Sequence, residues 1–429
     1  MARVVIVGAG FGGLACARAL SRRPVDVVLL DRHNYHLFTP LLYQVASSLL
    51  NPSDIAYPVR SALRHAPNVR FRMAGVRRVD PEARVVITNG GEEIAWDWLV
   101  LATGARNNFF GQDAVERESH ALNTLPNALA LRDRILRSFE QAVRQPPERA
   151  RCLTYVIVGG GPTGVEYAGA LAELVPLMRR DVPELAEAPI RIVLAEGRDR
   201  LLTAFQPSLG RHAAERLARL GVEVRLGEML QDAKPDVVTL TSGEPIPIGT
   251  LVWAAGVRPA PPGDLPFQTT RGGRYTVGPD LRVLDQDRIF AIGDVAACPA
   301  HPGGPELPML SAPAIQAGRY VARAILARES GRSVPPFRYR DKGIMAVIGR
   351  NAAVAQLGPL RVRGLAGWLM WLVVHLYFLI GFRNRFAVLM RWGWNYVFYD
   401  RPIRFIVPRE GGGKEQEQDD LPIHQPGHR

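Results

Sequence analysis

The chain has 429 residues, of which 47% are hydrophobic, so it is long enough to bury two or three separate cores. Its 53 Lys and Arg outnumber its 41 Asp and Glu, and the resulting formal charge of +12 suits an anionic partner such as nucleic acid or a membrane surface. The three cysteines, Cys16, Cys152 and Cys298, form no CxxC pair, which argues against dithiol chemistry and against a cysteine-bound metal. No histidine pair has ligand spacing with acidic support, so we predict no metal site.

The first predicted elements are an apolar strand over residues 3–7 and a helix that begins directly after it. The glycine-rich loop between them contains Gly8, Gly10, Phe11, Gly12 and Gly13. Glycines there allow a tight turn, and the helix N-terminus then meets a pyrophosphate. A second strand over 25–30 ends at Asp31 and Arg32, the spacing at which a carboxylate binds a ribose. The pattern predicts a dinucleotide site, although Asp31 merely capping its strand is an alternative.

The same pattern recurs in the middle of the chain. After an apolar strand that ends with residues 156–158, a second loop contains Gly159, Gly161, Pro162, Thr163 and Gly164. The following strand, 190–194, leads to Glu196, whose charge would repel a 2'-phosphate and therefore predicts NADH over NADPH. Arg198 and Arg200 lie close by and leave dual use open, and a strand-capping role for Glu196 is again the alternative. Two dinucleotide sites in one chain indicate electron transfer between two dinucleotides.

Further strand ends and breaks indicate how the domains are arranged. Three further strands end at small or acidic residues: Ala102, Thr103 and Gly104; Ala255 and Gly256; Gly293 and Asp294. A Pro/Gly-rich passage after Pro259 returns the chain toward its first domain. We predict an α/β fold with two Rossmann-like domains, one inserted in the other. The expected divisions are 1–120 with 281–345, 121–280, a C-terminal membrane-associating helical region over 346–409, and a disordered tail over 410–429.

The segment 365–382 is the most apolar part of the chain. It holds 18 residues without Lys, Arg, Asp or Glu, close to the roughly 20 that a spanning helix needs. From Arg361 to Arg409 there are eight arginines and one acid, Asp400, and both flanks of the segment are basic. Basic residues at both ends favour a helix lying in the membrane interface. A buried oligomer helix and a spanning helix are the alternatives, and His375 within the segment is either a packed side chain or a proton relay.

Several longer motifs occur together in this chain. They occupy 36–46 (HLFTPLLYQVA), 164–166 (GVE), 255–257 (AGV), 290–295 (FAIGDV) and 375–385 (HLYFLIGFRNR). In this order the chain resembles the type II NADH dehydrogenases up to about Arg409. The resemblance implies a single-subunit flavoprotein of the respiratory chain that passes two electrons from NADH to a quinone without pumping protons. It further implies tightly but non-covalently bound FAD, peripheral attachment to the cytoplasmic face of the cell membrane, and a possible homodimer.

The resemblance also implies which residues serve which cofactor. The first loop with Asp31, Arg32, Ala102 to Gly104, Gly293 and Asp294 would hold FAD, and an N-cap role is the alternative for Asp294. The second loop with Glu196, Ala255 and Gly256 would hold NADH.

Two residues are candidates for catalysis. Glu166 would supply a proton to the quinone, with hydrogen bonding to a nicotinamide ribose or to the loop as the alternative. Gln316 would orient the quinone, or else is a surface or packing residue.

The chain departs from the family pattern where the electron acceptor is expected to bind. The family commonly carries AQxAxQ where this chain has Ser311 to Gln316, so that Ala312 replaces the first glutamine. Menaquinone and ubiquinone both remain candidates. A reductase of a non-quinone acceptor and a slow NADH-binding redox sensor are the alternatives. A nucleic-acid partner is not expected, because the basic charge comes with no recognisable binding motif. Since the first strand begins almost at Met1, leaving no room for a signal peptide, we expect the catalytic body in the cytoplasm.

Overall fold

Two parallel five-stranded sheets form the body of the molecule, as expected for an α/β fold. The computed structural model describes residues 1–263, 265–401 and 403–406. The first sheet has the order β21-β9-β1-β2-β5 and the second β11-β18-β12-β13-β14. The strands of the first are β1 (Arg3–Val7), β2 (Asp26–Asp31), β5 (Val69–Met73), β9 (Trp98–Leu101) and β21 (Ile289–Ala291). Those of the second are β11 (Ser119–Ala121), β12 (Thr154–Val158), β13 (Arg191–Glu196), β14 (Val222–Leu226) and β18 (Thr250–Trp253).

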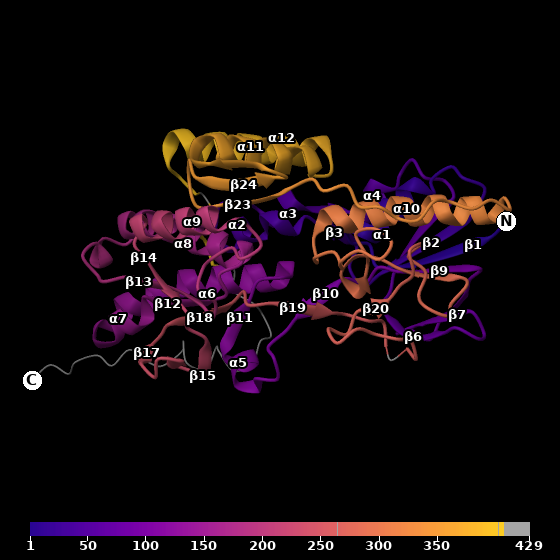
Figure 1. Cartoon of the computed structure of the whole chain (residues 1–429). Coiled ribbons are helices and arrows are strands. Elements are labelled where there is room, and N and C mark those ends of the chain that lie inside the picture. Colours follow the sequence, from indigo (N-terminus) through magenta and orange to yellow (C-terminus); the bar gives the residue numbers. More distant parts are fainter. Residues whose placement is uncertain (264, 402, 407–429) are drawn as a thin grey trace, which may run out of the picture.

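The second sheet is inserted into the first. β21 pairs with β9 although the whole second sheet lies between them in sequence. The chain leaves through β10 (Ala105–Asn107) and returns through β19 (Val257–Pro259), which pair antiparallel between the two sheets in Figure 1. The chain therefore passes between the two sheets at residues 105–107 and 257–259, earlier than the boundaries expected after residues 120 and 280. Residue 120 itself lies in β11 of the second sheet.

The main helices cover the sheets and bring the loops together. They are α1 (Phe11–Ala19), α6 (Leu125–Arg144), α7 (Arg149–Cys152), α8 (Pro162–Asp181), α9 (Pro207–Arg219) and α10 (Ser311–Glu329). α1 and α10 lie against one another because glycines meet at their contact. A Cβ on Gly318 would stand 2.2 Å from the carbonyl oxygen of Gly12, so a larger residue would force the helices apart.

Short elements complete the two units. Each sheet carries a small antiparallel meander: β6 (Val76–Asp80), β7 (Val85–Thr88) and β8 (Glu93–Ala95); β15 (Leu230–Lys234), β16 (Val237–Leu240) and β17 (Pro245–Pro247). Further short strands are β3 (Tyr35–Leu37), β4 (Ala56–Pro58), β20 (Tyr275–Thr276) and β22 (Ala296–Ala297). Short helices are η1 (Thr39–Leu41), α2 (Leu42–Ala46), α3 (Pro52–Ile55), α4 (Val59–Ala62), α5 (Asp113–Glu118), η2 (Pro146–Glu148), η3 (Pro183–Leu185) and η4 (Gly293–Val295).

The C-terminal region is a three-stranded sheet followed by two helices. β23 (Ile344–Val347), β24 (Ala353–Leu357) and β25 (Leu360–Arg363) are antiparallel. α11 (Gly364–Phe378) and α12 (Phe382–Phe398) form the outer layer, drawn in yellow in Figure 1. The apolar segment 365–382 therefore does not form one continuous helix. Its first helix, α11, ends at Phe378. The turn needs Gly381, at φ +88°, because a Cβ there would lie 2.4 Å from the ring of Tyr57.

Neither α11 nor α12, nor any other helix in the described ranges, is long and apolar enough to cross a membrane. The expected tail at 410–429 and Arg409 lie outside the described residues. Helices α11 and α12 are held to the body by polar contacts. Asn384 donates hydrogen bonds to the carbonyl oxygens of Ser53 and Asp54, both at 3.0 Å, and Arg391 forms an ion pair with Asp54 at 2.7 Å.

Candidate functional site

The first glycine loop shows why each of its glycines is needed. Gly8 has φ +107°, and a Cβ there would be 2.3 Å from the carbonyl oxygen of Ala102. A Cβ on Gly13 would be 1.8 Å from the carbonyl oxygen of Gly8. A Cβ on Gly10, by contrast, would meet no protein atom within 4 Å. Gly8 and Gly13 therefore let the loop fold, whereas Gly10 keeps space open in front of the α1 N-terminus, where a phosphate binds well. Gly12 packs against Ala314 of α10.

Asp31 holds this loop as well as facing the site. Its Oδ2 accepts a hydrogen bond from the amide of Ala9 at 2.7 Å, and its Oδ1 accepts one from the amide of His33 at 2.8 Å. Each oxygen keeps a lone pair for a ribose hydroxyl, so the two roles considered from the sequence are compatible. Arg32 is exposed beside it. Phe11 packs edge-on against the buried ring of His36, with ring centroids 5.0 Å apart.

Other predicted contacts of the first site lie at the same sheet edge. The hydroxyl of Thr103 is buried and has no hydrogen-bond partner among the described residues, a situation that costs about 1–3 kcal/mol and that a bound polar group would relieve. Ala102 and Gly104, the latter at φ +73°, flank it. Asp294 lies inside the turn η4 and not at its N-cap position, which is Ile292. Burial raises the pKa of the Asp294 carboxyl, and Arg274 opposes that shift. These features fit a bound dinucleotide.

The second loop repeats this geometry residue by residue. Gly159 has φ +113° and faces the carbonyl oxygen of Ala254, and a Cβ on Gly164 would lie 1.9 Å from the carbonyl oxygen of Gly159. Around Gly161 there is no protein atom within 4 Å of a built Cβ. Glu196 takes the place of Asp31: its Oε2 accepts from the amide of Gly160 at 2.6 Å and its Oε1 from the amide of Arg198 at 2.9 Å. The two glycine loops of the chain therefore have the same geometry, and we call each loop with its acid a cradle.

The remaining residues predicted for this site surround its opening. Pro162 occupies the first turn of α8, and Thr163 beside it is exposed. Ala255 and Gly256, the latter at φ +154°, follow β18 and lie at the same sheet edge.

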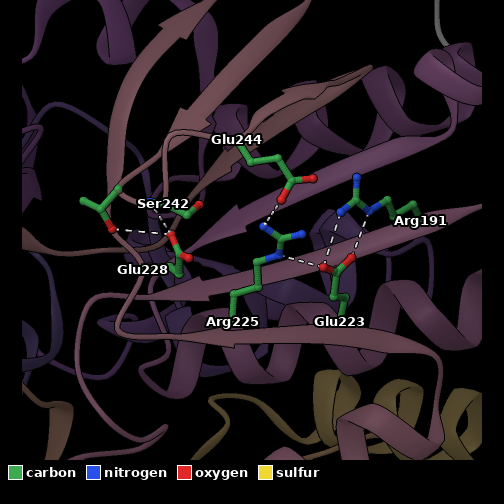
Figure 2. A network of polar contacts seen from close by, with 7 residues as sticks. Arg191, Glu223, Arg225, Glu228, Ser242 and Glu244 are labelled. Carbon is green, nitrogen blue, oxygen red and sulfur yellow. Dashed lines mark hydrogen bonds and ion pairs between the residues drawn. The ribbon is translucent and has the colours of Figure 1, made fainter.

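A network of charged side chains joins β13 to β14 and to Glu244 before β17 (Figure 2). Arg191 contacts Glu223 at 2.9 Å, and Arg225 contacts Glu223 at 2.6 Å and Glu244 at 2.8 Å. The two guanidinium groups lower the pKa of Glu223. Glu228 follows in the same loop, where its amide donates to the carbonyl oxygen of Glu196 at 3.0 Å. The loop after β14 is therefore hydrogen-bonded to the end of β13 at Glu196.

Glu166 lies in the first turns of α8 and is only 8% exposed. Its Oε1 accepts a hydrogen bond from the amide of Val347 in β23 at 3.2 Å. Burial raises the pKa of Glu166 to about 8, with smaller opposing effects from the Val347 amide and the Trp371 indole. A carboxyl group with such a pKa is protonated at neutral pH and can donate a proton.

Gln316, the second residue predicted to take part in catalysis, makes two hydrogen bonds to the main chain. Its Nε2 donates to the carbonyl oxygen of Arg340 at 2.9 Å, and its Oε1 accepts from the Arg340 amide at 3.0 Å. These contacts hold the segment before β23 against α10. Orientation of a quinone by Gln316 stays a prediction, and it would need one of these bonds to be given up or shared.

His375 packs between aromatic rings on α11. Its ring stacks on Trp371 at 4.1 Å between centroids, and Nδ1 lies 2.8 Å from the carbonyl oxygen of Trp371. Burial lowers the pKa of His375 to about 4. The neutral, packed histidine is the arrangement that the structure supports.

Four polar residues near Glu166 were not predicted from the sequence. They are the buried Tyr43, Gln44 and Arg401 and the partly buried Glu173. Arg401 is 2% exposed and forms an ion pair with Glu173 at 3.0 Å. They come from α2, from α8 and from the residues after α12, so no local motif unites them. The only signal available was the motif at 36–46, which contains Tyr43 and Gln44 without indicating their partners.

Comparisons with known proteins agree with this geometry. The family model described as pyridine nucleotide-disulphide oxidoreductase matches residues 2–318. Two type II NADH:quinone oxidoreductases of Mycobacterium tuberculosis are each 38% identical to this chain, over 91% of its length and 87% and 86% of theirs. An internal alternative NAD(P)H-ubiquinone oxidoreductase of Arabidopsis thaliana is 30% identical over 92% of this chain and 84% of its own.

A solved structure has the same fold. The structure of NDH2 from Plasmodium falciparum in complex with NADH superposes with a TM-score of 0.85, covering 94% of this chain and 99% of that one at 20% identity. At that identity the likeness concerns the fold alone. The sequence matches carry the assignment further, and they confirm the resemblance noted from the motifs. The chain belongs to the type II NADH:quinone oxidoreductases, within the pyridine nucleotide-disulphide oxidoreductase family.

Proposed function

We propose that this chain oxidises NADH bound at the second loop and reduces a quinone, with FAD held by the first loop. The observation that carries the proposal is the pair of matching cradles, each with an open glycine position and an acid at the end of the next strand. FAD, when bound, supplies the redox chemistry of hydride acceptance and electron donation. The protein binds and orients the two dinucleotides and excludes water between them.

The FAD site is assigned to the first loop because the additional polar groups lie there. Asp31, Thr103 and Asp294 come from the ends of β2, β9 and β21, so they lie along one sheet edge on which an extended cofactor is held. We assign the pyrophosphate to the space at Gly10 and the adenosine ribose to Asp31. Asp294 would then hold the ribityl chain. The NADH pyrophosphate takes the matching space at Gly161, with its ribose at Glu196.

Turnover of purified protein tests the proposal. We expect stoichiometric FAD in the isolated protein, rapid bleaching of its flavin absorbance by NADH, and recovery on adding a menaquinone or ubiquinone analogue at a catalytic rate. Recovery only with a soluble electron carrier would instead identify the protein as a reductase of another acceptor. Slow bleaching would identify a redox sensor. The family assignment favours neither alternative.

Glu196 is expected to set the preference for NADH. In Glu196→Ser the like charge is removed, and Arg198 and Arg200 remain beside the ribose site. We expect the ratio of kcat/KM for NADPH to that for NADH to rise about 10-fold, equivalent to roughly 1.4 kcal/mol. Glu187→Gln is the matched control, because it removes the charge of an exposed carboxyl group in the same domain. An equal change in the control would mean that general charge, and not Glu196, sets the preference.

We further propose peripheral attachment to the cytoplasmic face of the cell membrane through one apolar patch. The patch consists of exposed side chains on α11 and α12: Leu365, Leu369, Val373, Tyr377, Phe382, Phe386, Leu389, Met390, Trp394 and Val397. Within each helix, spacings of three or four residues keep these side chains on one side, and Leu389 and Met390 are adjacent on that side of α12. Such an extent of exposed apolar surface marks a contact with lipid or protein. Exposed arginines flank the patch, namely Arg361, Arg363, Arg383 and Arg385, and they suit anionic head groups.

Charged substitutions in the patch test the attachment. We expect Val373→Asp with Phe386→Asp to lower binding to anionic liposomes about 10-fold or more, because both side chains are mainly exposed and carry no core packing. Co-sedimentation measures it, with Leu284→Asp as the control on another surface. Truncation before Arg361 would be a poor test, because it also removes the buried Trp371 and Arg401. Unchanged liposome binding would reassign the patch to a homodimer contact, which the sedimentation coefficient in detergent would then report.

A further inference from the structure

Phe110 is the only exposed aromatic side chain among the described residues before α11. The residue is 61% exposed, and its backbone lies in the left-handed region at φ +53°. A bulky residue seldom adopts that conformation, and residues that do so gather at active sites and ligand clamps. Exposure and strain together mark Phe110 as a candidate contact for a bound molecule.

The turn that carries Phe110 is fixed to the end of β18. Phe110 follows β10 by three residues, and its amide donates a hydrogen bond to the Oδ1 of Asn108 at 3.0 Å. The Asn108 amide in turn donates to the carbonyl oxygen of Gly256 at 3.1 Å. The carbonyl oxygen of Asn108 accepts from the Nε1 of Trp253, the last residue of β18, at 3.0 Å. Polar contacts therefore hold the turn in place although the ring itself is exposed.

The Phe110 ring lies beside Gly256. A Cβ built on Gly256 would be 3.5 Å from the ring Cζ atom and 3.9 Å from Cε2. The Trp253 ring is farther away, with the centroids 6.2 Å apart and the ring planes at 62°. Gly256 belongs to the edge at which the second cradle opens, because a Cβ on Gly159 would be 2.5 Å from the carbonyl oxygen of Ala254. The exposed part of the Phe110 ring therefore borders the proposed NADH site.

The strand order of the second sheet shows which half of a dinucleotide lies near Phe110. β18 and β13 flank β12 on opposite sides, so Gly256 and Glu196 lie on opposite sides of the loop that follows β12. The proposed function places a ribose at Glu196 and the pyrophosphate at Gly161. The rest of NADH then extends across the end of β18 toward Gly256. The part of the substrate that reaches Phe110 is therefore the nicotinamide half.

The surface beside Phe110 suits a planar ring. Val257, the first residue of β19, is 42% exposed next to Gly256. Phe109 packs on the other side against Trp253, with ring centroids 5.6 Å apart. A phenyl ring packs well on a flat conjugated ring such as the nicotinamide of NADH, and its face attracts the positively charged ring of NAD⁺.

We propose that Phe110 binds the nicotinamide ring of NADH and restricts where that ring can lie. The inference rests on the proposed function, since it uses the positions given there to the ribose and the pyrophosphate. Phe110 takes no part in bond making or breaking. Its phenyl ring packs against the nicotinamide and keeps it in the orientation in which the hydride is transferred. Restricting the reacting ring in this way raises the transfer rate as well as the affinity.

Two ligands that differ in the nicotinamide test the contact. NAD⁺ carries the ring, whereas ADP-ribose lacks it but keeps the adenosine and the pyrophosphate. In Phe110→Asn the phenyl ring is lost, while the left-handed backbone is kept because asparagine tolerates it. We expect the Kd of the FAD-loaded protein for NAD⁺ to rise about 10-fold, which is the order of effect of stacking on an aromatic side chain. The Kd for ADP-ribose should stay unchanged, and isothermal titration calorimetry measures both.

Two further variants separate the ring from the backbone. Arg84→Asn is the matched control, because Arg84 is exposed, has the same φ of +53° and lies in the turn between β6 and β7 of the first unit. Neither Kd should change in this control. Phe110→Tyr keeps the ring and should bind both ligands as the wild type does. Flavin bleaching at saturating NADH should slow in Phe110→Asn and return to the wild-type rate in Phe110→Tyr.

The binding measurements also show which result would contradict the contact. Equal weakening of NAD⁺ and ADP-ribose in Phe110→Asn would mean a general disturbance of the second cradle and would overturn the inference. Unchanged binding of both ligands, or a loss of NAD⁺ affinity in Phe110→Tyr, would overturn it as well. These outcomes leave the proposed function intact. If the wild-type protein bound neither ligand and its flavin were not bleached by NADH, the proposed function would fail, and the inference with it.

Discussion

Gly10→Ala is expected to fold normally yet lose FAD, whereas Gly161→Ala should retain FAD and lose affinity for NADH. Both glycines have ordinary backbone angles, φ −68° and −72°, and a Cβ at either position meets no protein atom within 4 Å. An added methyl group therefore costs the folded protein little but occupies the space assigned to a pyrophosphate. We expect about 10-fold or greater weakening in each case, or at least about 1.4 kcal/mol. Flavin content measures the first effect and the NADH KM the second.

The two loops also supply the controls. Gly393→Ala adds a methyl group in an equally open position on α12, far from both loops in sequence, and should change neither quantity. Gly13→Ala should destabilise the fold itself, because its Cβ would lie 1.8 Å from a carbonyl oxygen. If Gly10→Ala purified with full FAD while Gly161→Ala did not, the assignment of the two cofactors to the two loops would have to be reversed.

The sequence was sufficient where structure depends on local pattern. Glycine spacing after an apolar strand predicted both cradles, and the acids at the next strand ends, Asp31 and Glu196, lie beside them as expected. A local pattern suffices because each loop directly joins a strand to a helix, and the acid lies at the end of the next strand, only one helix farther along the chain. The α/β fold follows from the same alternation of strands and helices.

Contacts between distant segments could not be predicted from the sequence. Glu173 and Arg401 are separated by 228 residues and meet only because the segment after α12 returns to α8. The side-chain amides of Gln44, Gln316 and Gln356 bind groups that no spacing rule relates to them. The break at Gly381 likewise depends on the ring of Tyr57, far away in sequence. Apolar composition alone indicated one helix, and tertiary contact made two.

These distant contacts join the proposed membrane surface to the proposed reaction site. The inner side of α12 bonds to Gln44 through Trp392 and to the α3 segment through Asn384, while its outer side forms the apolar patch. Helix α12 therefore carries both the apolar patch and, through Trp392 and Gln44, the hydrogen bonds that reach the Tyr43 hydroxyl. A patch variant that leaves the inner side intact is expected to lose membrane binding but to keep quinone turnover with a water-soluble analogue.

The largest catalytic effect is expected from Glu166→Gln. The glutamine keeps the side chain's size and can still accept from the Val347 amide, but it donates no proton. We expect quinone-dependent reoxidation to fall about 100-fold, within the usual contribution of a general acid, while flavin bleaching by NADH stays near wild type. Glu184→Gln, an exposed carboxyl of the same domain, is the control. A raised NADH KM with normal reoxidation would instead support a ribose-binding role, and no change in either would contradict both roles.

The pH dependence gives a second and independent reading of the same group. Because burial raises the pKa of Glu166 to about 8, the donor form predominates below that pH, and wild-type reoxidation should fall as pH rises through it. The fall should be absent in Glu166→Gln. The free energy of unfolding should change with pH in the same direction. The pKa of Glu166 in the folded protein lies above that of an unfolded carboxyl group, so the wild type loses stability as pH rises toward 8, and the variant does not. We therefore expect the Tm of Glu166→Gln minus that of wild type to increase between pH 5 and pH 9, and a constant difference would show that Glu166 is not held neutral by burial.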